Sequence, residues 1–244
     1  MIHDETMTAV VPVKGQSERV KNKNLRLLNG ESLLARKIRM LRNCTRINRI
    51  VVNSDSDEML RVGSDLGAEP LKRDPHFALG TTPMNDVIHH VMENSPFGHI
   101  YWAQVTSPLL TPETIDRAIA EYFAKLKEGY DSLASVQRLL MYLWKDGKPL
   151  NYTLDRHPNS QTLEPYFCMT FGILLIEREA ALKRRYYIGE RPYLFEVTPI
   201  EAIDIDTEYD LVMADLYLRM RDAKSTEPGR GADAAETDTQ KAAP

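Results

Sequence analysis

Short apolar runs alternate with longer amphipathic segments along most of the chain. The run TAVVPV at 8–13 is almost continuously apolar, as is typical of a strand buried on both faces of a parallel sheet. The segment SLLARKIRML at 32–41 instead repeats its apolar residues on one helical face. Similar runs predict strands at 47–53, 69–72, 101–104, 132–137 and 172–176, and helices at 57–67, 85–94, 112–127, 178–185 and 207–220. This alternation predicts βαβ units, and hence an α/β fold around a parallel sheet.

The alternation breaks between residues 138 and 167. This segment holds two hairpin-like strands around residues 146–149, so we expect an insertion and not part of the central sheet. From residue 225 onward the chain has no large apolar residue, and a segment that cannot bury apolar surface is expected to be disordered. We therefore expect one domain over residues 7–224, with an inserted flap at 138–167, and a disordered tail at 225–244.

Composition narrows the class of protein. No apolar run approaches the roughly 20 residues that a bilayer-spanning helix needs, and the first residues, MIHDETM, lack the apolar region of a signal peptide. The two cysteines, Cys44 and Cys168, have no CxxC spacing, which argues against a disulfide framework or a zinc site. We expect a cytoplasmic protein with no membrane partner.

Charge is distributed unevenly along the chain. Between Lys14 and Arg49 there are eleven Lys and Arg residues and two acids, although the whole chain has a net charge of −4. A basic stretch in an otherwise acidic protein indicates a local anion site more than a nucleic-acid surface, so we expect no nucleic-acid partner.

The stretch VVPVKGQSERVKNKN at 10–24 carries the densest part of this charge. It follows a predicted strand of a parallel sheet, and open α/β sheets bind ligands at the carboxyl edge of their strands. Neither a Walker A motif nor GxGxxG is present. Backbone amides around Gly15, together with Lys14, Arg19 and Lys23, are donors suited to a triphosphate. On charge alone, a solvated basic loop is an equally good interpretation.

Two carboxylates lie close together in AIDIDT, at 202–207. We expect a strand to end here, with Asp204 and Asp206 pointing to the same side. Adjacent carboxylates repel each other unless a cation lies between them, and oxygen ligands beside a phosphate substrate suit Mg²⁺. The alternative is a helix-capping turn, in which Thr207 and Asp210 form a capping box.

A third polar stretch, QVTSPLL at 104–110, again follows a predicted strand. Gln104, Thr106 and Ser107 therefore belong at the same sheet edge as the basic loop. Their neutral groups suit recognition of a base or a sugar, but they also occur in ordinary turns.

Together these stretches resemble the acylneuraminate cytidylyltransferase family, the CMP-sialic acid synthetases and their relatives, over residues 7–218. VVPVKGQSERVKNKNLR is similar to the family's I-P-A-R-x-G-S-K-x-x-x-x-K-N-L, and QVTSPLL to its Q-P-T-S-P-L. SDSDEMLRVGSDLGAEPLKR resembles the second strand-helix unit, and AIDIDTEYDL resembles S-I-D-I-D-T-x-x-D-L. Four similarities in the family's order are more specific than any one of them.

The resemblance implies a three-layer αβα nucleotidyltransferase fold of the GT-A, Rossmann-like kind, with a homodimer built on the inserted flap. It implies a reaction of CTP with an anionic acceptor, by family default a nonulosonic or octulosonic sugar acid, that gives the CMP-ester and pyrophosphate.

Roles for individual residues are also implied by the resemblance. Lys14, Arg19 and Lys23 would hold the β- and γ-phosphates, and Asp204 and Asp206 would hold Mg²⁺, with Asp206 also counted as catalytic. The nucleotide would be bound by Gly15, Ser17, Asn24, Arg73, Gln104, Thr106 and Ser107.

The acceptor side departs from the family pattern. Leu110 stands where the family usually has Arg, and Met169 and Phe171 stand where it has Arg and Asn. Such a pocket is less polar than a polyol would require, so a small phosphonate is an alternative acceptor. Glu18 occupies the place of a signature Lys, which leaves a catalytically silent nucleotide-binding regulator as a further alternative.

Overall fold

The computed structural model of the protein describes residues 6–15, 22–96 and 98–226. Its central strands are β1 (Met7–Pro12), β4 (Arg49–Ser54), β5 (Glu69–Lys72), β6 (His99–Trp102), β7 (Ser132–Leu139), β10 (Tyr166–Glu177) and β11 (Pro192–Glu196). They form one sheet in the order β11-β7-β10-β6-β1-β4-β5. β10 runs antiparallel to β6 and β7, and the other neighbours are parallel. The predicted α/β fold with a mostly parallel sheet is confirmed.

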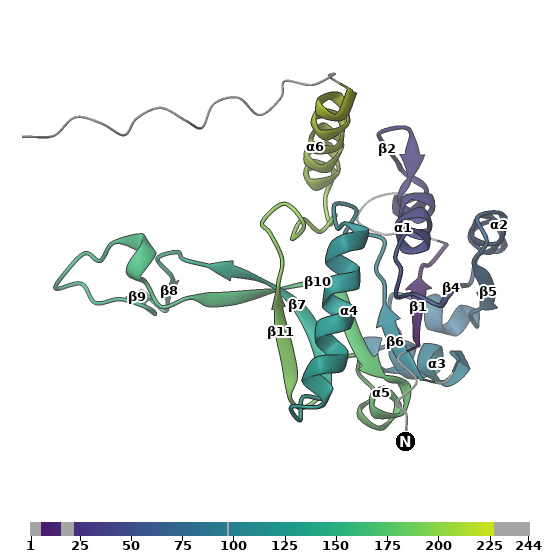
Figure 1. Ribbon diagram of the computed structural model, residues 1–244, viewed down its shortest axis with the longest axis horizontal. Helices are drawn as coiled ribbons and strands as arrows, with labels where there is room; N and C mark the ends of the chain where they lie inside the picture. The colour runs from purple at the N-terminus through teal and green to yellow at the C-terminus, as the bar shows by residue number, and fades with distance from the viewer. Residues whose placement is uncertain (1–5, 16–21, 97, 227–244) are drawn as a thin grey trace, which may run out of the picture.

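Helices cover both faces of this sheet and give the molecule three layers (Figure 1). The helices are α1 (Leu33–Arg42), α2 (Asp57–Asp65), α3 (Met84–Asn94), α4 (Pro112–Leu126), α5 (Arg178–Arg184) and α6 (Glu208–Thr226). Val11 of β1 packs in the apolar cluster with α1, α4 and α6, whereas Val10 packs in the cluster with α3 and α5. Because successive residues of a strand point to opposite faces, a continuously apolar strand is what two helical layers require.

Shorter elements lie between the central strands and the helices. They are η1 (Lys23–Leu25), the hairpin of β2 (Leu27–Leu28) and β3 (Glu31–Ser32), and the 3₁₀ turns η2 (Pro75–Ala78) and η3 (Ser160–Thr162). Asn29 and Gly30 form the turn of the β2–β3 hairpin, and both residues have positive φ (49° and 80°). No helix in the described part of the chain is long and apolar enough to cross a membrane.

The segment between β7 and β10 forms a projecting arm (Figure 1). β7 and β10 still pair at Leu139 and Tyr166, and their register is irregular between Met169 and Leu174. Further out, β8 (Trp144–Lys145) and β9 (Lys148–Pro149) form the hairpin that the sequence predicts around 146–149. Large apolar side chains are exposed along the arm: Met141, Tyr142, Trp144, Leu150, Leu154 and Phe167.

One sequence expectation about strands was wrong, and one strand was missed. Residues 202–206 are not a strand, and the segment instead lies against the loop after β6, where the Ile205 N–H donates to the Thr106 carbonyl at 2.8 Å. The edge strand β11 was not predicted, because PYLFE is short and begins with Pro192. Of the predicted tail, residues 227–244 lie outside the described residues.

Candidate active site

A cavity of about 220 Å³ lies at the carboxyl edge of the central sheet. The loops after β1, β5 and β6 contribute to its wall, as do η1, the start of α3 and the residues that follow α5. Among the residues that the structure describes, three cations line it, Lys14, Lys23 and Arg73, and no acidic residue does. The structure also brings Asn24, Gln104 and Thr106 to this wall, as the sequence predicts. The cavity therefore presents excess positive charge to whatever enters it.

η1 fixes the two lysines relative to each other. Asn22 adopts a left-handed conformation (φ 53°) immediately before η1, a conformation that Asn tolerates better than most residues. Asn24 is buried, and its Nδ2 donates to the Lys14 carbonyl at 2.9 Å. Lys23 Nζ donates to the Ile205 carbonyl and lies 3.4 Å from Asp206 Oδ1. The loop after β1 is thereby tied to the segment that carries the carboxylates.

Asn53, near the end of β4, positions the Arg73 side chain. Arg73 as a whole is 4% exposed, and its guanidinium donates from Nε to Asn53 Oδ1 at 2.6 Å and from Nη2 to the Asn53 carbonyl at 3.1 Å. Asn53 is itself held by a bond from its Nδ2 to the Leu71 carbonyl. Burial lowers the pKa of Arg73 to about 10, so the side chain keeps its charge at neutral pH.

The predicted capping box is present. The Asp210 carboxylate accepts from the backbone N–H groups of Asp206 and Thr207, at 3.1 and 2.7 Å, and Thr207 Oγ1 accepts from the Asp210 N–H at 3.3 Å. Because Thr207 and Asp210 fulfil the capping role, the Asp206 carboxylate, whose side chain is 42% exposed, faces outward beside Lys23. Capping and a ligand role for Asp206 are therefore compatible.

Lys37 belongs to this region, and the sequence analysis missed it. The side chain is fully buried, and Nζ donates to the Ser107 carbonyl at 3.0 Å. Burial lowers its pKa to about 7, against the opposing influence of Cys44 and Asp204. The signal was in the sequence: Lys37 stands on the apolar face of α1, where a cation needs a partner.

Other predicted residues lie outside the cavity lining. The Gly15 N–H donates to Asp55 Oδ1 at 2.9 Å, an interaction that the sequence did not suggest. Ser107 is buried, and its Oγ would lie 3.1 Å from a Cβ at Gly172, so its hydroxyl packs against β10. Arg19 and Ser17 lie outside the described residues.

Aromatic side chains form another part of the cavity wall. Trp102 and Tyr187 both line the cavity, with ring centroids 5.4 Å apart. Phe171 lies edge-on to Tyr187 at 6.5 Å, and its φ of 56° is unusual for a bulky residue. It stands where the register of β10 is irregular, so a local distortion turns this ring toward Tyr187.

The sequence profile of the cytidylyltransferase family matches residues 8–219, most of the chain. The chain belongs to the cytidylyltransferase family. The resemblance to acylneuraminate cytidylyltransferases is thereby confirmed. The chain is 25% identical to N-acylneuraminate cytidylyltransferase A of Danio rerio over 218 residues, which are 86% of this chain and 50% of the relative. It is 27% identical to CMP-N,N'-diacetyllegionaminic acid synthase of Legionella pneumophila, over 87% of this chain and 96% of the relative.

Solved structures of cytidylyltransferases share the fold. A CMP:2-keto-3-deoxy-manno-octonic acid synthetase complexed with CTP superposes with a TM-score of 0.65, at 12% identity over 88% of this chain and 99% of that chain. The chain spans about half the length of the first fish relatives that it matches, and nearly the whole length of the bacterial synthase.

Proposed function

We propose that the protein transfers CMP from CTP to an anionic acceptor and releases pyrophosphate. The observation that carries this proposal is the cavity at the sheet edge, in a chain of the cytidylyltransferase family. The described residues that line this cavity include three cations and no acid. In the reaction an acceptor oxygen attacks the α-phosphorus of CTP, the bond from that phosphorus to the bridging oxygen breaks, and the electron pair leaves with pyrophosphate. Positioning and charge neutralisation would supply most of the rate.

Different residues of the cavity would bind different parts of CTP. Lys14 and Lys23 would neutralise the β- and γ-phosphates, as would Arg19, which lies outside the described residues. Arg73 has two of its donors occupied by Asn53 and would offer the remainder to the nucleotide. Gln104 and Thr106, with Asn24, would contact the nucleoside.

We propose Mg²⁺ as the metal, held by Asp204 and Asp206. These residues fit the ion, because Mg²⁺ prefers carboxylate oxygens and completes its shell with substrate phosphates and water. The exposed Asp206 carboxylate beside the cationic cavity is in a position to share an ion with a phosphate. When bound, the metal would stabilise negative charge that develops on the α-phosphate.

The acceptor we propose is a sugar acid, since the bacterial and fish relatives are named for such substrates. One observation favours a smaller acid instead. Met169 and Phe171 pack with the apolar cluster that contains Trp102 and Tyr187, so that side of the site offers few hydrogen bonds to a polyol. A small phosphonate is therefore the second candidate.

The experiment that separates these candidates incubates the protein with CTP and Mg²⁺ and a panel of acceptors. The panel contains N-acetylneuraminate, an octulosonic acid and several small phosphonates, and mass spectrometry detects the CMP-linked product. Product with a sugar acid supports the first candidate, and product with a phosphonate alone supports the second. Binding of CTP without product from any acceptor would instead favour the silent regulator.

A further inference from the structure

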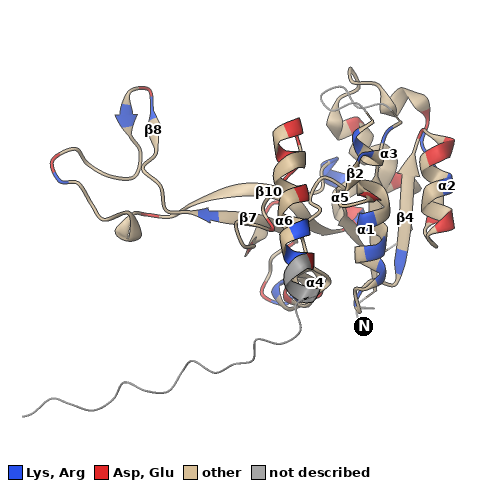
Figure 2. Ribbon diagram, turned by 90° about the horizontal axis from the view of Figure 1, so that it is seen from above, with Lys and Arg blue, Asp and Glu red and all other residues tan. Residues whose placement is uncertain are grey.

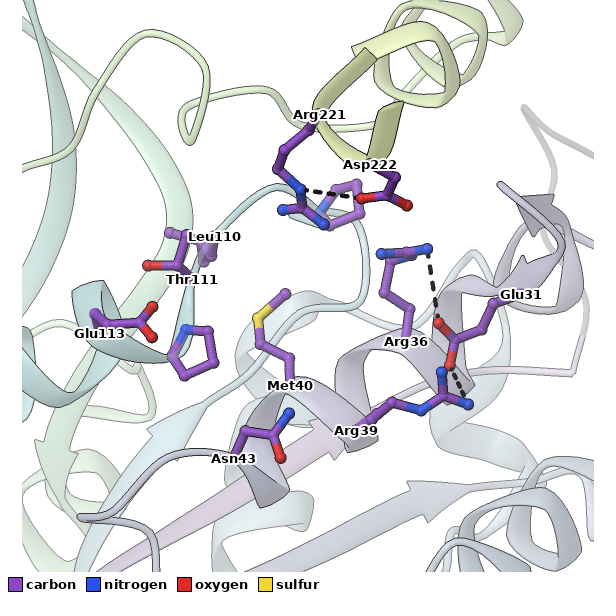
Figure 3. Close-up of a pocket in the computed structure, with 12 residues that line it drawn as sticks. Glu31, Arg36, Arg39, Met40, Asn43, Leu110, Thr111, Glu113, Arg221 and Asp222 are labelled. Carbon is purple, nitrogen blue, oxygen red and sulfur yellow. Dashed lines mark hydrogen bonds and ion pairs between the residues drawn. The ribbon is translucent and has the colours of Figure 1, made fainter. Parts of the chain in front are cut away.

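A second cavity, of about 400 Å³, lies between α1, α6 and the first turn of α4 (Figure 3). We call it the Arg36 pocket. Met40 and Leu110 are apolar residues of its wall, and six charged residues surround it: Glu31, Arg36, Arg39, Glu113, Arg221 and Asp222. None of these residues lines the candidate active site.

The hydrogen-bonding capacity of Arg36 is not used up by the protein. Its side chain is 14% exposed, with Nη2 3.3 Å from the Leu28 carbonyl and 3.6 Å from Glu31 Oε2. Its Nε is buried and has no hydrogen-bond partner among the described residues. A guanidinium has five donors, and a buried one without an acceptor is unfavourable, so this group has a donor to offer a ligand.

Two of the three acids of the pocket, Glu31 and Asp222, lie beside other polar groups of the chain. Both Glu31 oxygens lie near arginines, with Oε1 3.0 Å from Arg39 Nη2 and Oε2 near Arg36 (Figure 3), but Oε1 is buried and makes no hydrogen bond within the described residues. Asp222 Oδ2 accepts from Asn29 Nδ2 at 2.7 Å, and Oδ1 lies 3.4 Å from Arg221 Nε. Glu113, in the first turn of α4, is exposed.

The three arginines of the pocket also have N–H groups that make no hydrogen bond in the described structure. Arg39 and Arg221 are 64% and 46% exposed, and each has further N–H groups. Burial lowers the pKa of Arg36, the charges of Arg221 and Arg39 lower it further, and Glu31 and Asp222 only partly offset this. An added negative charge would stabilise all three guanidinium groups.

The pocket shares structural elements with the candidate active site. Gln104 and Thr106 line the active-site cavity, whereas Pro108 and Leu110 of the same loop line the Arg36 pocket. Between them, the Ser107 carbonyl accepts from Lys37, the neighbour of Arg36 in α1.

We propose that the Arg36 pocket binds a small carboxylate or phosphate anion, and that its occupancy is coupled to nucleotide binding through the loop 104–110. The three arginines supply bidentate donors, which match the oxygens of both kinds of anion. Binding of the anion does not depend on the proposed catalytic activity.

The test measures the melting temperature of the protein during titration with inorganic phosphate and, separately, with malonate. CTP is present to occupy the active site, and EDTA is present to remove divalent metal. The titration is repeated without CTP, so that anion binding at the Arg36 pocket is still measured if CTP does not bind. The variants are Arg36→Lys, which keeps the charge but loses Nε, and the exposed Arg221→Gln. Arg219→Gln is the matched control, because Arg219 is an exposed arginine of α6 that pairs with Asp215 outside the pocket.

We expect at least one of the anions to stabilise the wild type and Arg219→Gln equally, with roughly tenfold weaker apparent affinity in Arg36→Lys and Arg221→Gln. A response to phosphate alone or to malonate alone would identify the class of anion. Equal stabilisation of all four proteins would be a general salt effect, and it would overturn the proposal, as would no stabilisation by either anion. If Arg36→Lys does not fold, the apparent anion affinity of Arg221→Gln is compared with that of the wild type and Arg219→Gln.

Coupling is measured as the Kd for CTP in EDTA, with and without malonate. Malonate that competes with CTP at the active site would raise the Kd for CTP alike in every variant. Coupling is therefore measured as the difference between proteins in the factor by which malonate changes that Kd. We expect malonate to change the Kd for CTP by a different factor in the wild type than in Arg36→Lys, since coupling between sites is reciprocal. Equal factors in both proteins would show that the sites are independent.

Discussion

At the residue scale, the cations of the active-site cavity are held in place by partners that leave donors for a ligand. Arg73 is anchored by Asn53, and Lys23 by the Ile205 carbonyl and Asp206. Such anchoring fixes the charges before a phosphate arrives, which lowers the cost of organising them.

Arg73→Lys tests this anchoring. Lysine keeps the charge but cannot reproduce the fork that bonds Asn53 and a phosphate together. We expect the Kd for CTP, measured by calorimetry, to rise by about tenfold, with Arg49→Lys as the exposed control. An unchanged Kd would show that Arg73 does not contact the nucleotide.

Lys37 makes a prediction about stability and pH. Its pKa is about 7 in the folded protein, against an ordinary value of 10.5. Between these values the unfolded chain binds more protons than the folded one, so this group makes stability rise with pH across that window. We expect the free energy of unfolding of the wild type, relative to Lys37→Met, to rise by up to about 1.4 kcal/mol per pH unit between pH 7 and 9. Denaturant titrations in which this difference stays constant with pH would contradict the shifted pKa.

Some of these residues were predictable and others were not. Lys14, Lys23, Asn24 and Arg73 meet in one cavity because loops after parallel strands converge at a sheet edge. Asp55, which accepts from Gly15, depends on how two loops pack, and no local pattern encodes that.

At the element scale, the segment between β11 and α6 is positioned by hydrogen bonds and not by a strand ladder. The Ile205 N–H bonds the loop after β6, and Asp210 holds the N–H groups of Asp206 and Thr207. The alternation in AIDID favoured a strand, but the segment contacts the loop after β6 and pairs with no strand in the described part of the chain. β1 was predictable for the opposite reason, since burial on both faces requires its apolar run.

Asp210→Ala removes the capping box. We expect the free energy of unfolding to fall by about 1–2 kcal/mol, because the two N–H groups lose their acceptor. Asp65→Ala, at an exposed acid of α2, is the control and should change it by less than about 0.5 kcal/mol. A change in Asp210→Ala as small as that of the control would mean that water replaces the cap at no cost.

At the scale of the whole molecule, the projecting arm exposes apolar side chains that a single chain leaves in water (Figure 2 shows the arm from above). Clustered exposed apolar residues often mark interaction surfaces, and we propose that the arm forms a homodimer interface. Its length and hairpin were visible as a break in the βαβ alternation. The partner surface was not, because association depends on shape in three dimensions.

A paired substitution tests the dimer. We expect sedimentation to show a dimer for the wild type, and a monomer with an unchanged far-ultraviolet circular dichroism spectrum for Trp144→Lys combined with Leu154→Lys. These side chains are 52% and 70% exposed, so lysine causes no clash within the chain. A wild type that sediments as a monomer would remove the proposal.

The most direct test of the proposed function is release of pyrophosphate from CTP with Mg²⁺ and the acceptor panel, compared between the wild type and Asp206→Asn. We predict acceptor-dependent release with CTP, little with ATP or GTP, and a loss of about 100-fold or more in Asp206→Asn, since one carboxylate of the charge-stabilising set is neutralised. Asp206→Asn should keep its melting temperature. No release with any acceptor, or equal release by Asp206→Asn, would contradict the account.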